Sequence, residues 1–176
     1  MSKAKILAIC GSTKDNSSNE LILKAIRKLY CEILDVEIYT KIAELPHFNP
    51  DVDNDNPPQN VVEFRKLISR ADGVIFSTPE YVFSLPGSLK NALEWTVSTT
   101  VFSGKPAAFI IAGTAGEKAF ESLDLILKTI GANVAENSKI IIKAAKSKLD
   151  KNGEISGEVT LAEVRKMIES LMQTIK

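Results

Sequence analysis

The chain has 176 residues, in which 22 lysines and arginines balance 22 aspartates and glutamates, so its formal net charge is zero. This length predicts one domain over residues 1–176, and the lack of dense basic clusters argues against a nucleic-acid partner. The apolar stretch that ends at Cys10 is too short for a signal-peptide core or a bilayer span, so we expect a cytoplasmic protein with no membrane partner.

The first predicted elements are a buried strand over residues 5–10 and a helix that starts near Glu20. The nine residues between them, GSTKDNSSN, deliver hydroxyls, amides and one amine to a helix N-terminus, where free N–H groups and the helix dipole favour an anion. Neither G-x-G-x-x-G nor the Walker A spacing occurs, so the loop suits one compact phosphate better than a phosphate chain. The polar side chains concerned are Ser12, Thr13, Lys14, Asn16, Ser17, Ser18 and Asn19.

The loop could instead cap the following helix or place a cysteine nucleophile. Ser17 and Glu20 have the S-x-x-E spacing of a capping box, so the loop could serve only to start the helix, and this alternative stays open. Cys10 ends a strand as the nucleophile of small tyrosine phosphatases does, but their C-x5-R pattern would need an arginine where Asn16 stands. We therefore expect Cys10 to be a buried apolar residue.

A strand at a sheet edge is expected after the first helix, because Val36 and Ile38 alternate with acidic residues. Residues 45–58 are rich in proline, asparagine and aspartate, which predicts irregular structure, and His47 within them receives no role. One histidine and two separated cysteines predict no metal site. The helix expected after this stretch has a buried stripe of Val61, Phe64, Leu67 and Ile68.

A buried strand over residues 74–78 leads into a loop that is unusually apolar. Four of the nine residues 79–87 are large and apolar, a pattern typical of a binding surface. The alternative is that this loop folds under itself. The next helix starts near Pro86, with Trp95 on its flank and with Leu89, Ala92 and Leu93 inside.

The remaining elements continue the alternation of strands and helices. A strand over residues 106–112 opens into Gly113–Gly116, whose small residues let a ligand approach the backbone, and Gly131 ends the helix that follows. A fifth strand is expected around Val134 and residues 140–142. Thr160 and Glu163 have capping-box spacing, which predicts that the last helix starts there.

This order of elements predicts an α/β fold with a parallel sheet between two layers of helices. The half-exposed second strand belongs at an edge, so the strand order 2-1-3-4-5 fits best, and ligands bind at the carboxyl ends of the strands near the switch point. The loops at residues 11–19, 79–87 and 113–116 leave the sheet there and should share one crevice. Anion donors, an apolar wall and small residues suit a flat ring system with a monophosphate, and flavin mononucleotide (FMN) is the commonest such cofactor.

The segments GSTKDNSSN and PEYVFSLPGSLKNALEW resemble the flavodoxin-like NAD(P)H-dependent FMN reductase family, whose patterns are close to G-S-x-R-x-x-S-x-N and P-E-Y-N-x-x-x-P-G-x-L-K-N-A-x-D-W. Lys14 stands where the family has arginine, which keeps the charge but loses the bidentate fork. Val82 stands where the family has asparagine, which removes an amide near the flavin. The resemblance implies that the FMN phosphate is held by Ser12, Lys14, Ser17 and Asn19, with Ser18 beside them. It also implies that Pro79, Glu80, Tyr81 and Val82 lie along the isoalloxazine ring, with Gly113 and Thr114 at its pyrimidine edge.

The implied reaction is hydride transfer from NADPH or NADH to FMN, followed by electron delivery to a small acceptor such as free flavin, a quinone, an azo compound or chromate. No catalytic side chain is predicted. The alternatives are a non-enzymatic flavodoxin-like electron carrier, which the neutral charge disfavours, and a flavin-free protein with the same fold. The apolar residues Tyr81, Phe83, Leu85 and Trp95 predict a homodimer or a dimer of dimers, as the family often forms.

Overall fold

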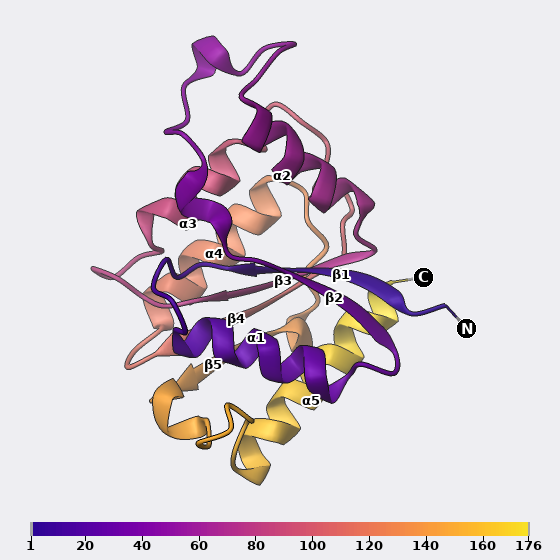
Figure 1. Cartoon of the computed structure of the whole chain (residues 1–176), viewed down its shortest axis with the longest axis vertical. Coiled ribbons are helices and arrows are strands. Elements are labelled where there is room, and N and C mark those ends of the chain that lie inside the picture. The colour runs from indigo at the N-terminus through magenta and orange to yellow at the C-terminus, as the bar shows by residue number, and fades with distance from the viewer. Residues whose placement is uncertain (1, 176) are drawn as a thin grey trace.

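The computed structural model describes residues 2–175. It contains one five-stranded sheet in the order β2-β1-β3-β4-β5 (Figure 1). All neighbouring strands are parallel. The strand β2 pairs with one side of β1, and the strands β3, β4 and β5 extend the sheet from the other side. The predicted strand order is confirmed. The strands are β1 (Ala4–Cys10), β2 (Leu34–Tyr39), β3 (Gly73–Thr78), β4 (Ala107–Gly113) and β5 (Lys139–Lys143).

Two layers of helices cover the sheet, with α1 and α5 on one face and α2, α3 and α4 on the other (Figure 1). Each face has its own apolar core, because residues of the central strands point alternately to the two sides. The predicted three-layer, flavodoxin-like architecture is therefore confirmed. The helices are α1 (Ser18–Leu29), α2 (Gln59–Arg70), α3 (Gly87–Glu94), α4 (Glu117–Thr129) and α5 (Glu158–Thr174), with short 3-10 turns at Lys41–Glu44, Pro50–Val52, Glu136–Ser138 and Ala145–Lys148.

Burial along the strands matches their place in the sheet. All six residues of β3 are buried, as a central strand covered on both faces requires. In β2, Leu34 and Val36 are buried whereas Asp35 and Glu37 are exposed, so this strand has the half-exposed pattern of a sheet edge. The sequence prediction for both strands is confirmed.

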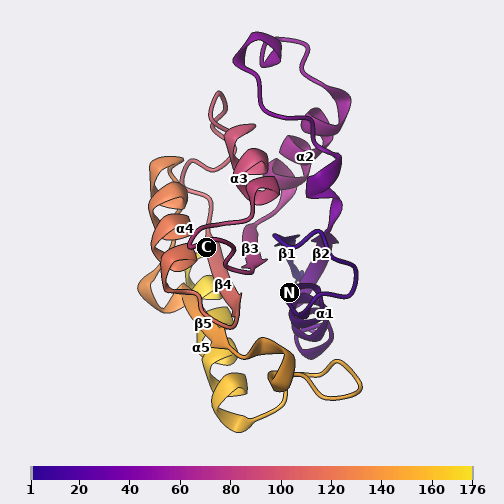
Figure 2. The same ribbon diagram turned by 90° about the vertical axis from the view of Figure 1, so that its left-hand side faces the viewer.

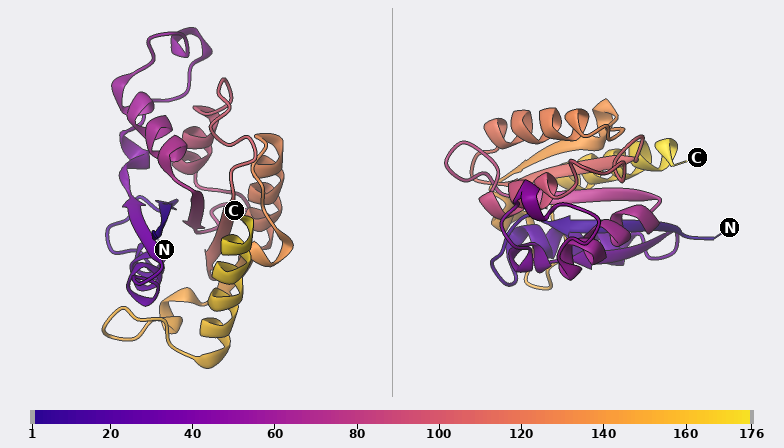
Figure 3. Two further views of the ribbon diagram at one scale, coloured as in Figure 1. Left: turned by 90° about the vertical axis from the view of Figure 1, so that its right-hand side faces the viewer. Right: turned by 90° about the horizontal axis from the view of Figure 1, so that it is seen from above.

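The loops that follow β1, β3, β4 and β5 all leave the sheet at its carboxyl edge, which faces the viewer in Figure 2. The N-terminus and the end of α5 lie at the opposite edge, shown in the left panel of Figure 3. Any site built from these four loops is therefore remote from both ends of the chain.

The long irregular stretch between β2 and α2 covers α3. Trp95 is fully buried beneath it, donates from Nε1 to the Pro46 carbonyl at 2.7 Å, and meets the Phe48 ring edge-on at a centroid distance of 5.2 Å. Arg65 fixes the stretch by an ion pair with Asp53 at 2.6 Å, in which the two side chains are only 13% and 5% exposed. Burial opposes ionisation of Asp53, but hydrogen bonds from Arg65 and Ser98 outweigh it and lower the pKa of that carboxyl. The dimer prediction counted Trp95 among the exposed apolar residues, and this was wrong, because a segment distant in sequence covers it.

Two element boundaries also differ from the sequence prediction. The last helix starts at Glu158 after Gly157, so Thr160 lies inside its first turn as a buried residue and forms no capping box. Gly157 has a φ of +91°, a backbone conformation that is unfavourable for residues with a side chain but not for glycine. Val134 lies outside β5, which is shorter than expected.

Among residues 2–175, no helix combines the length and the apolar character needed to cross a bilayer.

Candidate functional site

A pocket of about 910 Å³ lies at the carboxyl edge of the sheet, where all three predicted loops meet. The β1–α1 loop forms one wall, Pro79 and Tyr81 form part of a second, and Gly113 and Thr114 contribute a third. Residues after β5 form a further wall that the sequence prediction missed. The lining residues are Ser12, Lys14, Asn16, Ser17, Ser18, Asn19, Leu21, Pro79, Tyr81, Ala112, Gly113, Thr114, Ala144, Ala145, Lys146, Ser147, Leu149, Asp150 and Lys151.

Ser17 caps α1, as the alternative interpretation of the loop proposed. Its Oγ accepts a hydrogen bond from the Glu20 N–H at 3.2 Å. The Glu20 carboxylate returns to the Asn16 N–H at 2.8 Å rather than to Ser17 itself. This displaced capping box is compatible with anion binding, because a hydroxyl that accepts a bond from the backbone still has a proton to donate.

The loop presents several donors to the pocket. Ser12 Oγ accepts from the Lys14 N–H at 3.3 Å, which leaves its proton free to donate. Ser17 Oγ also contacts Cys10 Sγ at 3.9 Å, a weak partner that a phosphate oxygen would replace as acceptor. Within residues 2–175, the N–H groups of Ser18 and Asn19 at the start of α1 have no hydrogen-bond acceptor. Two buried hydroxyls, two free N–H groups and the Lys14 amine therefore converge beside a helix N-terminus, which is the donor set that a phosphate needs.

Asn19 fixes this helix start onto the sheet. Its Nδ2 donates to the Ala112 carbonyl at 3.2 Å, and its Oδ1 accepts from Ser77 Oγ at 3.0 Å. The side chain thereby links α1 to the ends of β3 and β4 and is itself buried. Asn19 lines the pocket, but most of its bonding capacity is used to position the loop.

Gly11 lets the same loop approach β3 closely. A Cβ atom at this position would lie 2.3 Å from Thr78 Oγ1, 2.5 Å from Thr78 Cβ and 2.9 Å from a methyl group of Leu89. The first two distances are far inside van der Waals contact, so only glycine fits here.

Residues Tyr81–Ser84 form a tight hairpin at the tip of the β3–α3 loop. Tyr81 and Ser84 exchange two backbone hydrogen bonds, of 2.9 and 3.0 Å, around Val82 and Phe83. Both central residues have positive φ, of +51° and +55°, as in a type I′ turn. Val82 is 95% exposed and Phe83 80% exposed, whereas Leu85 is buried. Among the four large apolar residues of the loop, the alternative that the loop folds under itself thus holds only for Leu85.

Glu80 and Val82 are not lining residues of the pocket, although both were predicted to lie along a bound ring. The Glu80 carboxylate accepts hydrogen bonds from the N–H groups of Lys118 and Ala119, at 2.8 and 2.9 Å, and so caps the start of α4. Val82 points away at the hairpin tip. The Glu80 nitrogen still lies beside Gly113, so Glu80 can offer a ligand its backbone, whereas no atom of Val82 lines the pocket.

The left-handed backbone at Val82 gives a physical reason for an asparagine in the family pattern. Asparagine tolerates this conformation, whereas a β-branched residue in it costs about 1–2 kcal/mol. We expect Val82→Asn to raise the free energy of unfolding by about 1 kcal/mol, which is a rise in melting temperature of roughly 2–4 °C. The control is Val97→Asn, at a valine that is also exposed but has no positive φ. If calorimetry finds the same change in melting temperature for the two variants, backbone strain at Val82 is refuted.

Four non-glycine residues in the described part of the chain have positive φ, and all four lie in loops at this edge of the sheet. They are Asn16 after β1, Val82 and Phe83 after β3, and Ala144 after β5. Strained backbone persists where the surrounding structure or function imposes it, and it concentrates at binding sites. The clustering marks the edge as the functional end of the molecule.

Cys10 is buried, as predicted, and its sulfur contacts Ser12 and Ser17 of the pocket wall. Burial is the main cause that raises the pKa of its thiol. Its Sγ donates to the Ser12 carbonyl at 3.4 Å, so the thiol supports the loop and is not a thiolate nucleophile.

These residues fit FMN in the chemistry of their donors and walls. The donors of the β1–α1 loop suit a monophosphate, and Pro79 and Tyr81 oppose Gly113, whose lack of a side chain keeps the gap open. A Cβ atom on Gly113 would lie 3.3 Å from the Ala115 carbonyl and 3.9 Å from the Glu80 nitrogen, so the β3 and β4 loops are adjacent here. The fold and the site define a flavodoxin-like protein that binds a phosphate-bearing planar ligand.

Comparison with known proteins narrows this class. Residues 4–147 match the model of the family "NADPH-dependent FMN reductase". The chain is 36% identical to the NADH-dependent flavin reductase subunit 2 of Lactobacillus johnsonii, over 89% of each chain. It is 32% identical to a 2-hydroxy-1,4-benzoquinone reductase from a Burkholderia species, over 96% of this chain and 92% of that protein. The solved structure of the NAD(P)H:(acceptor) oxidoreductase FerB from Paracoccus denitrificans superposes with a TM-score of 0.87 at 26% identity, over 98% and 97% of the two chains.

The chain belongs to the NADPH-dependent FMN reductase family. It is an oxidoreductase that uses FMN and NAD(P)H, and the enzymatic interpretation is favoured over a non-enzymatic electron carrier. The resemblance seen in the sequence is confirmed.

Proposed function

We propose that this enzyme passes electrons from NAD(P)H through FMN to a small planar acceptor, either a quinone or a free flavin. The observation that carries the proposal is the open pocket in which phosphate donors and a ring-binding gap meet at one edge of the sheet. Similar proteins are named as reductases of benzoquinone and of flavin, which are both planar. When bound, FMN supplies the redox chemistry, and the chain supplies binding and orientation.

The proposed roles follow the walls of the pocket. Ser12, Lys14, Ser17 and Ser18 bind the phosphate with the N–H groups of α1, and Asn19 holds that helix start in place. On the ring side, Pro79, Tyr81, Gly113 and Thr114 flank the isoalloxazine. Glu80 contributes its backbone beside Gly113, and Val82, at the hairpin tip, lies outside the pocket. We assign no catalytic side chain, because transfer between stacked rings needs position rather than an acid or base.

The experiment that tests this function is turnover by FMN-loaded protein with NADPH or NADH and either benzoquinone or free riboflavin as acceptor. We expect acceptor-dependent oxidation of the nicotinamide with at least one of the two acceptors. Protein that binds FMN and oxidises NAD(P)H, but does so no faster with either acceptor than without one, would contradict the proposed acceptor class.

We also propose a cytoplasmic homodimer. At the hairpin tip, Tyr81, Val82 and Phe83 leave an apolar surface in water, and a second copy would cover it. Leu85 and Trp95 no longer support this prediction, since both are buried within the chain. Light scattering should give twice the mass of one chain, and Phe83→Ser should shift the protein toward the monomer. A wild-type monomer at micromolar concentration would refute the dimer.

The cytoplasmic location is proposed because the enzyme depends on NAD(P)H. Cell fractionation tests it, and recovery of the protein outside the cytoplasmic fraction would contradict it.

A further inference from the structure

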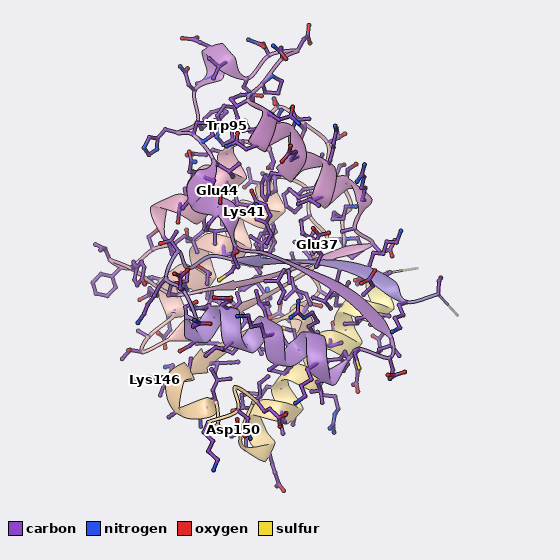
Figure 4. All side chains as sticks on the ribbon, in the orientation of Figure 1. Glu37, Lys41, Glu44, Trp95, Lys146 and Asp150 are labelled. Carbon is purple, nitrogen blue, oxygen red and sulfur yellow. The ribbon has the colours of Figure 1, made fainter. Side chains whose placement is uncertain are left out.

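The segment after β5, residues 144–151, lines the pocket but has no part in the function proposed above. It lines the same pocket as the phosphate-binding loop, and Figure 4 shows Lys146 and Asp150 on it, below α1 in that view. We call this segment the β5 loop. The family match ends at residue 147, so half of the β5 loop lies beyond it.

The charge of the pocket is unbalanced although the whole chain is neutral. Lys14, Lys146 and Lys151 line the pocket, and none of them forms an ion pair among the described residues. By contrast, the nearby Lys143 is paired with Glu117. The one lining carboxylate, Asp150, accepts hydrogen bonds from the N–H groups of Asn152 and Glu154, at 2.8 and 2.9 Å.

The β5 loop is held rigidly in this position. Ala144 adopts the left-handed conformation with φ of +50°, and its carbonyl accepts hydrogen bonds from both the N–H and the Oγ of Ser147, at 2.8 and 2.9 Å. Further along, the Ser156 N–H bonds to the Lys148 carbonyl at 2.8 Å, and Glu154 forms an ion pair with Lys28 of α1. Local hydrogen bonds and an exposed ion pair to the last turn of α1 thus give this wall of the pocket a defined shape, and the left-handed backbone at Ala144 is of the kind found at ligand sites.

We propose that the β5 loop is the second wall of a phosphate site, in which Lys146 and Lys151 bind a phosphate group from the side opposite Ser12 and Ser17. Two ammonium groups that form no ion pair and line the same pocket as a helix N-terminus suit a doubly charged oxyanion. The phosphate belongs either to FMN itself or to the nicotinamide dinucleotide that reduces it. This inference rests on the proposed function, because the same pocket must take these ligands.

The test compares ligands that differ in one phosphate. FMN and riboflavin are titrated into flavin-free protein and followed by quenching of flavin fluorescence, and KM for NADPH and NADH is measured on FMN-saturated enzyme. The variants are Lys146→Ala, Lys151→Ala and the double variant. The matched control is Lys148→Ala, because Lys148 is an exposed lysine of the same segment that does not line the pocket.

We expect each single variant to weaken binding of the phosphate-bearing ligand by about 10-fold, and the double variant by more. If the phosphate is that of FMN, affinity for FMN falls while affinity for riboflavin is unchanged. If it is a phosphate of the dinucleotide, FMN binding is unchanged and KM rises for NADPH alone or for both dinucleotides. Either pattern supports the proposal, and the control should show neither.

The proposal is overturned if the double variant matches Lys148→Ala in all four measurements, or if riboflavin binding falls as much as FMN binding. Failure of the proposed function would look different. In that case the wild-type protein would bind neither flavin, or would bind FMN without oxidising NADPH or NADH.

Discussion

Gly11→Ala should lower the free energy of unfolding by about 3 kcal/mol, because the added Cβ atom would overlap Thr78 and crowd Leu89. For a chain of this length the melting temperature falls by roughly 6–12 °C. Relief requires a shift of the β1–α1 loop away from β3, and that shift carries Ser12 out of the pocket. FMN affinity should therefore fall together with stability, which calorimetry and fluorescence titration measure on the same protein.

Gly87→Ala is the matched control for this change. Gly87 is the first residue of α3, has no positive φ, and would place a Cβ atom in open space. Alanine there should leave both melting temperature and FMN affinity close to the wild-type values. If Gly11→Ala behaved like Gly87→Ala, the close approach of the loop to β3 would not be a requirement of the fold.

Ser17→Ala and Ser12→Ala should each weaken FMN binding by about 10- to 150-fold, because a charge-assisted hydrogen bond to the phosphate contributes about 1.5–3 kcal/mol. Riboflavin has no phosphate, so its affinity should hardly change. This comparison separates the two roles of Ser17, since loss of its cap at α1 would affect both flavins equally.

Turnover of these two variants at saturating FMN should stay near that of the wild type, since the ring is held by other residues. A loss of several orders of magnitude in turnover with FMN fully bound would contradict the assignment of no catalytic side chain. Equal losses of FMN and riboflavin affinity would instead show that the hydroxyls act on the loop and do not contact the phosphate.

The fold could be predicted because each strand carries its own signal. The run Val74–Phe76 is apolar and its strand proved central, whereas Val36 and Ile38 alternate with acidic residues and proved to lie at an edge. The last helix start could not be read in the same way. Thr160 and Glu163 have capping-box spacing, but Gly157 turns the chain earlier, and tertiary packing buries Thr160.

The site could be predicted only where a loop has an unusual composition. The hydroxyl-rich loop after β1, the apolar loop after β3 and the small-residue loop after β4 met this condition, and all three line the pocket. The β5 loop did not, because Lys146 and Lys151 look in sequence like ordinary exposed lysines. Their place in the pocket wall depends on how the chain folds back after β5, through contacts between distant residues such as the Lys28–Glu154 ion pair just beyond the β5 loop.

The directions of individual side chains could not be predicted from the sequence. Glu80 and Val82 lie next to Tyr81, but one turns back to cap α4 and the other points into solvent from a strained hairpin. Likewise, the sequence around Trp95 contains no pattern that predicts its burial under the stretch around Pro46 and Phe48.

Anaerobic mixing of FMN-loaded protein with NADPH or NADH tests the central claim most directly. The account predicts that the yellow flavin absorbance bleaches with one equivalent of at least one dinucleotide, and that it returns when benzoquinone is added. Protein that binds FMN yet keeps its yellow colour with both dinucleotides would contradict the assignment of this chain as an NAD(P)H-dependent reductase.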